Sequence, residues 1–269
     1  MPAFRADIPD QSNLTMRQTI LSFLALTTLA IVLSSCGGGS SSESTPAASE
    51  EAAQATTSMG SASVSGTVSF TGTAPERPRI RQDRDCSALN EEAPLGETVI
   101  VNDNGTLRNV FIYVKEGLGD ANFAVPDEPV VFDQDGCIYH PHVFGIQVGQ
   151  TLEIHNSDPL MHNLHALAEE NRPFNFGMPN EGDVREQQFR VPEVMLHIKC
   201  DVHPWMSAYA GVVDHPFYSV SSDEGSFAIS GLPAGNYVVE AWHEEYGMAT
   251  QNVTVADGEA ASIDFSFGS

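Results

Sequence analysis

The densest group of side chains able to do chemistry lies near residue 200. Cys200, His203 and Met206 follow one another at intervals of three residues, and His162 precedes Cys200 by 38 residues. A thiolate, two imidazoles and a weak thioether form a donor set that suits copper as it changes between its two oxidation states. A zinc site would use Cys and His donors and gain nothing from Met206. A binuclear copper site would need a second cysteine beside Cys200, which this segment lacks. The spacing therefore predicts a single copper ion.

The flanking segments must bring these side chains together. Apolar and polar residues alternate over residues 194–200, which predicts a strand with the Cys200 thiol on its buried face. A loop begins directly after Cys200, and its tight spacing allows three side chains to converge on one point. Residues 143–148 and 152–155 are predicted strands that lead toward His162.

These segments carry a family resemblance. Residues 145–156 and 161–165, together with the Cys-x2-His-Pro-x-Met loop, look like the ligand-bearing segments of cupredoxins, the type 1 blue copper proteins of the amicyanin and plastocyanin kind. The similarity spans residues 137–215. It implies three equatorial ligands and one axial ligand, which are His162, Cys200, His203 and, in the axial position, Met206.

The resemblance also assigns roles to neighbouring residues. It implies that Asn163 ties the two ligand segments together, and that His203 is the exposed ligand through which electrons pass. His165 is a rival to His162, because either side chain could face the site, and the Asn that follows His162 favours His162. We expect Trp205, inside the ligand loop, to pack beside His203.

The rest of the chain is predicted to be all-β. Short alternating segments are separated by turn residues, and residues 163–186 look irregular, with at most a short helix at 167–170. We predict a cupredoxin Greek-key β-sandwich with an N-terminal β extension over residues 61–215. Residues 216–269 contain a Leu-Pro-x-Gly-x-Tyr pattern and resemble the small β-sandwich of carboxypeptidase-regulatory or transthyretin-like repeats. We expect this C-terminal sandwich to be structural, with binding of a partner or glycan as the alternative.

The N-terminal segment predicts export. Residues 20–33 form an apolar run too short to cross a bilayer comfortably, with Arg17 before it and Leu-Ser-Ser leading to Cys36. This pattern resembles a bacterial lipoprotein signal over residues 1–35, with Met16 as a possible true start and Cys36 as the lipidated residue. Residues 36–60 are rich in Gly, Ser, Ala and Glu and are predicted to be a flexible tether.

Cys86 and Cys137 remain after the lipid anchor and the copper ligand are assigned. In an exported protein the economical prediction is a disulfide that joins the N-terminal region to the start of the core. A pair of free thiols is the alternative. His140 and His142 flank a proline. We expect each of them to form a hydrogen bond. The alternative is that they form a second metal site or a proton-linked site.

The charge balance restricts the partners. The chain has 36 Asp and Glu against 12 Lys and Arg, a formal net charge of −24. Nucleic-acid binding needs clustered bases, so this class of function is excluded, as is attachment to an anionic membrane by charge. The sequence shows no phosphate-binding glycine loop, nucleophile elbow or zinc-protease helix.

The predicted function is one-electron transfer by a carrier that is not itself an enzyme. Its partners would be redox proteins such as a c-type cytochrome or a periplasmic oxidoreductase. It would be held in the bacterial envelope by its lipid anchor alone, facing the periplasm, with the outer membrane favoured, or the cell surface. The alternatives are a copper carrier or sensor, and an interaction module of the envelope that uses the C-terminal sandwich.

Overall fold

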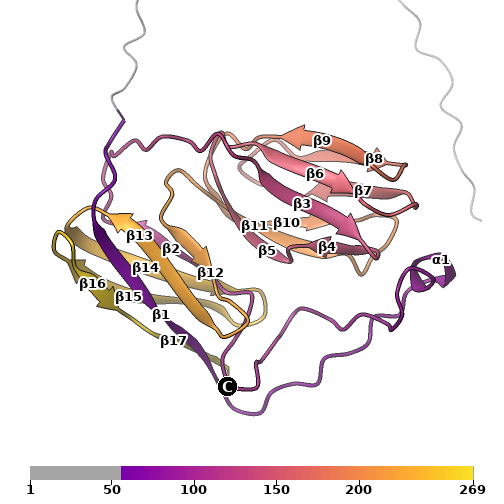
Figure 1. Cartoon of the computed structure of the whole chain (residues 1–269), viewed down its shortest axis with the longest axis horizontal. Coiled ribbons are helices and arrows are strands. Elements are labelled where there is room, and N and C mark those ends of the chain that lie inside the picture. Colours follow the sequence, from indigo (N-terminus) through magenta and orange to yellow (C-terminus); the bar gives the residue numbers. More distant parts are fainter. Residues whose placement is uncertain (1–55, 269) are drawn as a thin grey trace, which may run out of the picture. The chain divides into compact units, whose positions relative to one another are not determined.

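A computed structural model describes residues 56–268 (Figure 1). The predicted signal, Cys36 and most of the predicted tether lie outside the described residues. No helix in the described part of the chain has the length and apolar character that crossing a membrane requires. The strands are β1 (Ala62–Thr71), β2 (Phe111–Glu116), β3 (Val130–Asp135), β4 (Ile138–His140), β5 (Val143–Gln147), β6 (Leu152–Asn156), β7 (His162–Ala166), β8 (Phe174–Met178), β9 (Asp183–Gln187), β10 (Glu193–Lys199), β11 (Ser207–Val213), β12 (Tyr218–Val220), β13 (Ser226–Leu232), β14 (Gly235–His243), β15 (Gly247–Val255), β16 (Ala260–Ser262) and β17 (Phe265–Gly268). The all-β prediction is confirmed.

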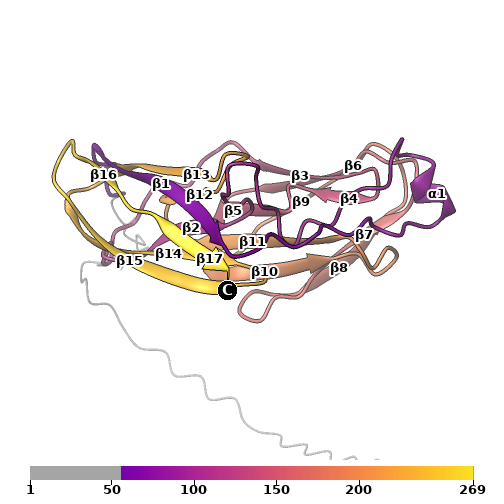
Figure 2. The ribbon, with the colours of Figure 1, turned by 90° about the horizontal axis from the view of Figure 1, so that it is seen from below.

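Strands β3 to β11 form a first β-sandwich. One sheet has the order β4-β3-β6-β9 and the other the order β5-β11-β10-β7-β8. Figure 2 shows β3, β6 and β9 in one layer and β10, β7 and β8 in the other. Alternating residues face the space between the sheets, so that Phe132, Ile154, Leu164 and Ile198 are fully buried in one apolar cluster.

Residues 163–186 are more regular than the sequence suggested. They contain most of β7 and all of β8, with β9 beginning at Asp183, and residues 167–170 form no helix. Strand β9 is polar and largely exposed at the edge of its sheet, so it lacks the apolar alternation by which a strand is recognised in a sequence. Strand β8 does alternate, with Phe174, Phe176 and Met178 on its less exposed side, but the pattern covers only five residues.

The second sandwich combines strands from both ends of the described chain. Strand β1 lies between β13 and β16 and also pairs with β17, and β2 pairs with β12 and β14 in the facing sheet. By their pairing, β1 and β2 therefore belong with residues 218–268, although the sequence predicted residues 61–215 as one region. The reason is that Ala62, Val64 and Val68 need a buried face, and the second sandwich supplies it. Residues 57–60, expected in the tether, contribute hydrogen bonds to Asn122 and Gly231.

A long segment between β1 and β2 returns to the first sandwich. It contains the four-residue helix α1 (Arg84–Ser87), whose first turn is capped by the Asp83 side chain accepting a hydrogen bond from the main-chain N–H of Cys86. A disulfide joins Cys86 to Cys137, which lies in the turn between β3 and β4. This is the pairing that the sequence favoured, and it holds α1 against the first sandwich.

Two glycines allow the sandwiches to pack closely. Phe111 of β2 lies over β5 and β11, where a Cβ atom at Gly211 would come within 2.3 Å of its ring. A Cβ atom at Gly145 would come equally close to the ring of Tyr218. Only glycine leaves room for an aromatic ring directly against the backbone here.

A buried ion pair also links the sandwiches. The Nε2 atom of His142 contacts the carboxylate of Glu244, and its Nδ1 atom lies 3.0 Å from the carbonyl oxygen of Ser207. Both nitrogens thus face acceptors, an arrangement that fits the protonated imidazole. Burial lowers the pKa of His142, but Glu244 and the nearby Glu97 outweigh it and raise the pKa above its ordinary value. His140, in contrast, is exposed, so the described residues show no His140–His142 metal pair.

This ion pair predicts a pH-dependent stability. A histidine whose pKa is raised on folding stabilises fully below its unfolded pKa, and the contribution is lost as pH rises through the folded pKa. We expect Glu244→Gln to lower the free energy of unfolding by about 1–3 kcal/mol at pH 6, and by less at pH 9. Chemical denaturation at both pH values measures this difference.

The matched control is Glu245→Gln, because Glu245 is the exposed neighbour. Burial lowers the pKa values of His197 and His243, and Glu244 partly offsets this shift, so the loss of Glu244 acts at these two histidines in the same direction as at His142. A loss of stability that is the same at both pH values would contradict the pairing of a protonated His142 with Glu244.

Candidate metal centre

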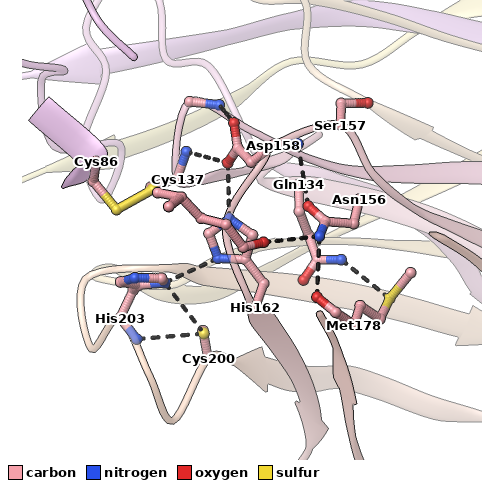
Figure 3. Close-up of polar contacts among 12 residues, drawn as sticks. Cys86, Gln134, Cys137, Asn156, Ser157, Asp158, His162, Met178, Cys200 and His203 are labelled. Carbon is pink, nitrogen blue, oxygen red and sulfur yellow. Dashed lines mark hydrogen bonds and ion pairs between the residues drawn. A yellow bond between two sulfur atoms is a disulfide. The ribbon is translucent and has the colours of Figure 1, made fainter. Parts of the chain in front are cut away.

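Three predicted ligands converge at one end of the first sandwich (Figure 3). The Nδ1 atoms of His162 and His203 lie 2.9 Å apart, and the Cys200 sulfur lies 3.8 Å from Nδ1 of His203. One donor atom from each residue falls within 4.8 Å of the other two. All three residues are buried, His162 completely. This convergence from two distant segments is what a metal ion with sulfur and nitrogen ligands requires.

The ligand loop is closed by its own backbone. Strands β10 and β11 are paired as far as Lys199 and Ser207, and between them the N–H of Met206 donates to the carbonyl of His203 at 2.9 Å. The N–H of His203 in turn points at the Cys200 sulfur, 3.4 Å away. Such N–H donors stabilise a thiolate and fix its direction. Met206 is buried in the same apolar cluster as Cys200, and its role as axial ligand stays a prediction.

A buried carboxylate orients His162. The Nε2 atom of His162 lies 2.8 Å from Oδ2 of Asp158, so this nitrogen carries the proton and the Nδ1 lone pair is left for a metal. Asp158 itself accepts hydrogen bonds from the N–H groups of Gly136 and Cys137, both at 2.8 Å. Asp158 is not among the site residues predicted from the sequence, although a carboxylate four residues before a candidate ligand is a signal that could have found it.

The loop that carries Asp158 is fixed by Asn156. Its amide group donates to three carbonyl groups, those of Leu160, Met178 and Asn180, at 2.9–3.1 Å. Its side-chain oxygen accepts the N–H of Asp158 at 3.1 Å. With these bonds Asn156 ties the loop before His162 to residues around the end of β8.

The electrostatics of the site favour a charged pair when no metal is bound. Burial lowers the pKa of His162, but hydrogen bonds to Asp158 and Cys200 outweigh it and raise the pKa to about 9. Burial raises the pKa of the Cys200 thiol, but His162 and nearby N–H groups lower it overall. A thiolate is the form of cysteine that binds metals, so the site is prepared for a cation that replaces the proton.

Asn163 and His165 take different positions on β7. The Asn163 side-chain oxygen accepts the N–H of Asp201 at 2.6 Å, so Asn163 ties β7 to the residue after Cys200, in the role that the resemblance implied. His165 instead bonds to the Asp201 carboxylate at the surface. The structure thus brings His162, and not His165, into the donor cluster.

His203 is covered, contrary to the expectation that it is the exposed ligand. Only 5% of His203 is accessible to solvent. Asp83 reaches within 3.8 Å of its Nε2 atom, and the sulfurs of Cys86 and Cys137 lie within 4.8 Å of a nitrogen of its ring. We call residues 83–90, with α1 at their centre, the cap. The expectation was wrong because the disulfide fastens the cap over the imidazole.

Trp205 packs against His203 on another side, as the sequence predicted, with ring centres 5.2 Å apart. Its indole N–H donates to the carbonyl of Cys137 at 2.9 Å. Cys137 therefore contacts both ligand segments, through Asp158 on one side and Trp205 on the other.

Several solved copper proteins are structurally similar to part of this chain. A copper-containing nitrite reductase from Thermus scotoductus SA-01 is 22% identical with a TM-score of 0.31, over 37% of this chain and 26% of its own. A purple cupredoxin from Nitrosopumilus maritimus is 23% identical with a TM-score of 0.26, over 31% of this chain and 98% of its own. A reduced, Cu(I) form of an amicyanin variant is 21% identical with a TM-score of 0.29, over 38% of this chain and 97% of its own.

The sequence comparisons concern the C-terminal part. No curated protein matches this chain. The family model of the carboxypeptidase regulatory-like domain matches residues 211–268, which confirms the resemblance found in the C-terminal segment.

Proposed function

We propose that this protein binds a single copper ion through His162, Cys200 and His203, with Met206 as the fourth ligand, and carries single electrons between redox proteins. The observation that supports this most directly is the buried cluster of two Nδ1 atoms and one sulfur. A cluster of two imidazoles, one thiolate and a nearby thioether matches the preferences of copper in both oxidation states.

The surroundings suit a metal that changes charge without moving its ligands. Copper supplies a centre that gains and loses one electron. Asp158 holds the His162 ring, the loop backbone holds Cys200 and His203, and Asn163 holds the two segments together. Ligands held this firmly keep one geometry in both oxidation states, and their burial excludes water from the metal.

The partners and location remain those proposed from the sequence. We propose an electron carrier rather than an enzyme, anchored by a lipid at Cys36 in the bacterial envelope and facing the periplasm. It would exchange electrons with a c-type cytochrome or a periplasmic oxidoreductase. The charge of −24 would attract a basic partner by steering that weakens with salt. Because the cap covers His203, such a partner would approach the site across the cap.

Reconstitution with Cu(II) tests the ligand set. We expect an intense visible thiolate-to-copper charge-transfer band with narrow copper hyperfine splitting, bleached by reductant and restored by oxidant. Cys200→Ser should abolish the band because the sulfur is its source. Met206→Leu should keep the band and shift the reduction potential.

His165→Ala is the matched control and should keep the band, because His165 lies outside the donor cluster. A band that survives Cys200→Ser would contradict the ligand assignment. Protein that binds copper but cannot be reversibly reduced and oxidised would contradict electron transfer and favour a copper carrier or sensor.

Asp158→Asn tests the orientation of His162. We expect copper affinity to fall about 10–100-fold, since partners of metal ligands contribute on this scale. Competition with a chromogenic chelator measures the change. Asp135→Asn is the control, because Asp135 is exposed and lies on the β3–β4 hairpin whose turn donates hydrogen bonds to Asp158. Equal affinities in the two variants would show that Asp158 does not position the ligand.

A further inference from the structure

His203 belongs to two donor sets. On its inner side it meets His162 and Cys200, and on its outer side it meets the sulfurs of Cys86 and Cys137, each set lying within 4.8 Å (Figure 3). We propose that reduction of the Cys86–Cys137 disulfide creates a second, outer site for Cu(I), and that copper reaches the inner site through it. This inference rests on the proposed function, because it assumes that the inner site takes copper.

The outer set has the right chemistry for the reduced ion. Two thiolates and one imidazole are soft ligands that select Cu(I). All three residues are buried, Cys86 and Cys137 completely, so an ion bound there would be shielded from water. The shared imidazole would allow an ion to pass inward by ligand exchange, in which Cys200 and His162 replace the two outer sulfurs.

The outer set also lies where an ion would have to enter. The inner donors are buried, and Asp83, whose side chain is 54% exposed, lies 3.8 Å from Nε2 of His203. The path from solvent past Asp83 to His203 therefore passes directly beside the disulfide.

The cap is held by few contacts. Apart from the disulfide, its described polar contacts with the first sandwich are the hydrogen bond from the Asn90 amide to the carbonyl of Gly136 at 3.0 Å and the approach of Asp83 to within 3.8 Å of His203. The adjoining Gln82 donates to the same Gly136 carbonyl at 2.9 Å. Helix α1 is a single turn, and the residues on either side of Cys86 are exposed. A short exposed turn of this kind opens locally at a small fraction of the cost of global unfolding.

The redox step balances with a dithiol reductant of the thioredoxin class. A reductant thiolate attacks one sulfur of the disulfide, and the S–S bond breaks. The reductant then closes its own disulfide, so that two electrons and two protons pass to Cys86 and Cys137. Cu(I) displaces the thiol protons and keeps its oxidation state.

Cys200→Ser isolates the outer site, because it removes the inner thiolate. We would reduce this variant with an immobilised phosphine, count its thiols with a colorimetric reagent, and measure Cu(I) affinity anaerobically by competition with bicinchoninate. We expect one Cu(I) per chain, bound at least 100-fold more tightly than by the oxidised variant. X-ray absorption should show two sulfur scatterers and one nitrogen scatterer.

Two further variants test the donor set. In the Cys200→Ser background, Cys86→Ser with Cys137→Ser should bind no more tightly than the oxidised protein. Adding His203→Ala to the reduced Cys200→Ser variant should weaken binding at least about tenfold, because even indirect partners of metal ligands contribute that much. Equal Cu(I) affinity with and without His203 would overturn the proposed site, since the two thiols alone would then explain the binding.

Near-ultraviolet circular dichroism follows the fold throughout. A disulfide that is reduced only when the tertiary signal is lost would also overturn the proposal.

Failure of the proposed function and failure of the outer site can be told apart. Wild-type protein that shows the charge-transfer band, with no Cu(I) binding by reduced Cys200→Ser, would reject the outer site alone. The reverse pattern would reject the inner copper site, and with it the inward passage of copper, but would leave the outer Cu(I) site standing.

Discussion

The candidate metal centre depends on the three polar and covalent connections of Cys137. Its N–H donates to Asp158, its carbonyl accepts from Trp205, and its sulfur is bonded to Cys86. The first connection reaches His162 through a carboxylate, the second reaches the ligand loop, and the third fastens the cap. Cys137 adopts a positive φ of 57°, a conformation that non-glycine residues seldom take and that the surrounding contacts enforce.

These contacts show how a buried polar site is kept stable. Asp158 is buried, and a buried carboxylate is costly unless donors surround it. Two backbone N–H groups and one imidazole supply these hydrogen bonds. Burial raises the pKa of Asp158, but the hydrogen bonds outweigh it, so the pKa lies below its ordinary value. The same residues that meet this electrostatic requirement also set the direction of His162. Stability and ligand orientation thus rest on one set of hydrogen bonds.

The parts of the site that the sequence predicts are local in the chain. Cys200 and His203 lie on one closed loop, and alternation along β10 predicts the buried thiol correctly. Features that need distant contacts could not be read in this way. The spacing of Asp158 from His162 is visible in the sequence, but its contacts with the Gly136 and Cys137 N–H groups form only in the fold. Likewise, β1 is an ordinary strand until β13 lies next to it. The covering of His203 follows only when the disulfide is placed beside the ligand loop.

The pairing of β1 and β2 with the C-terminal strands has a consequence for the order of folding. During synthesis these two strands emerge before the whole of the first sandwich, yet β1 receives its partners β13, β16 and β17 only after residue 226. Residues 130–213 form their own core and can fold while β1 still lacks its partners. Contacts across such a separation slow folding. The second sandwich should therefore be the last to form, and the Cys86–Cys137 bridge can close before it does.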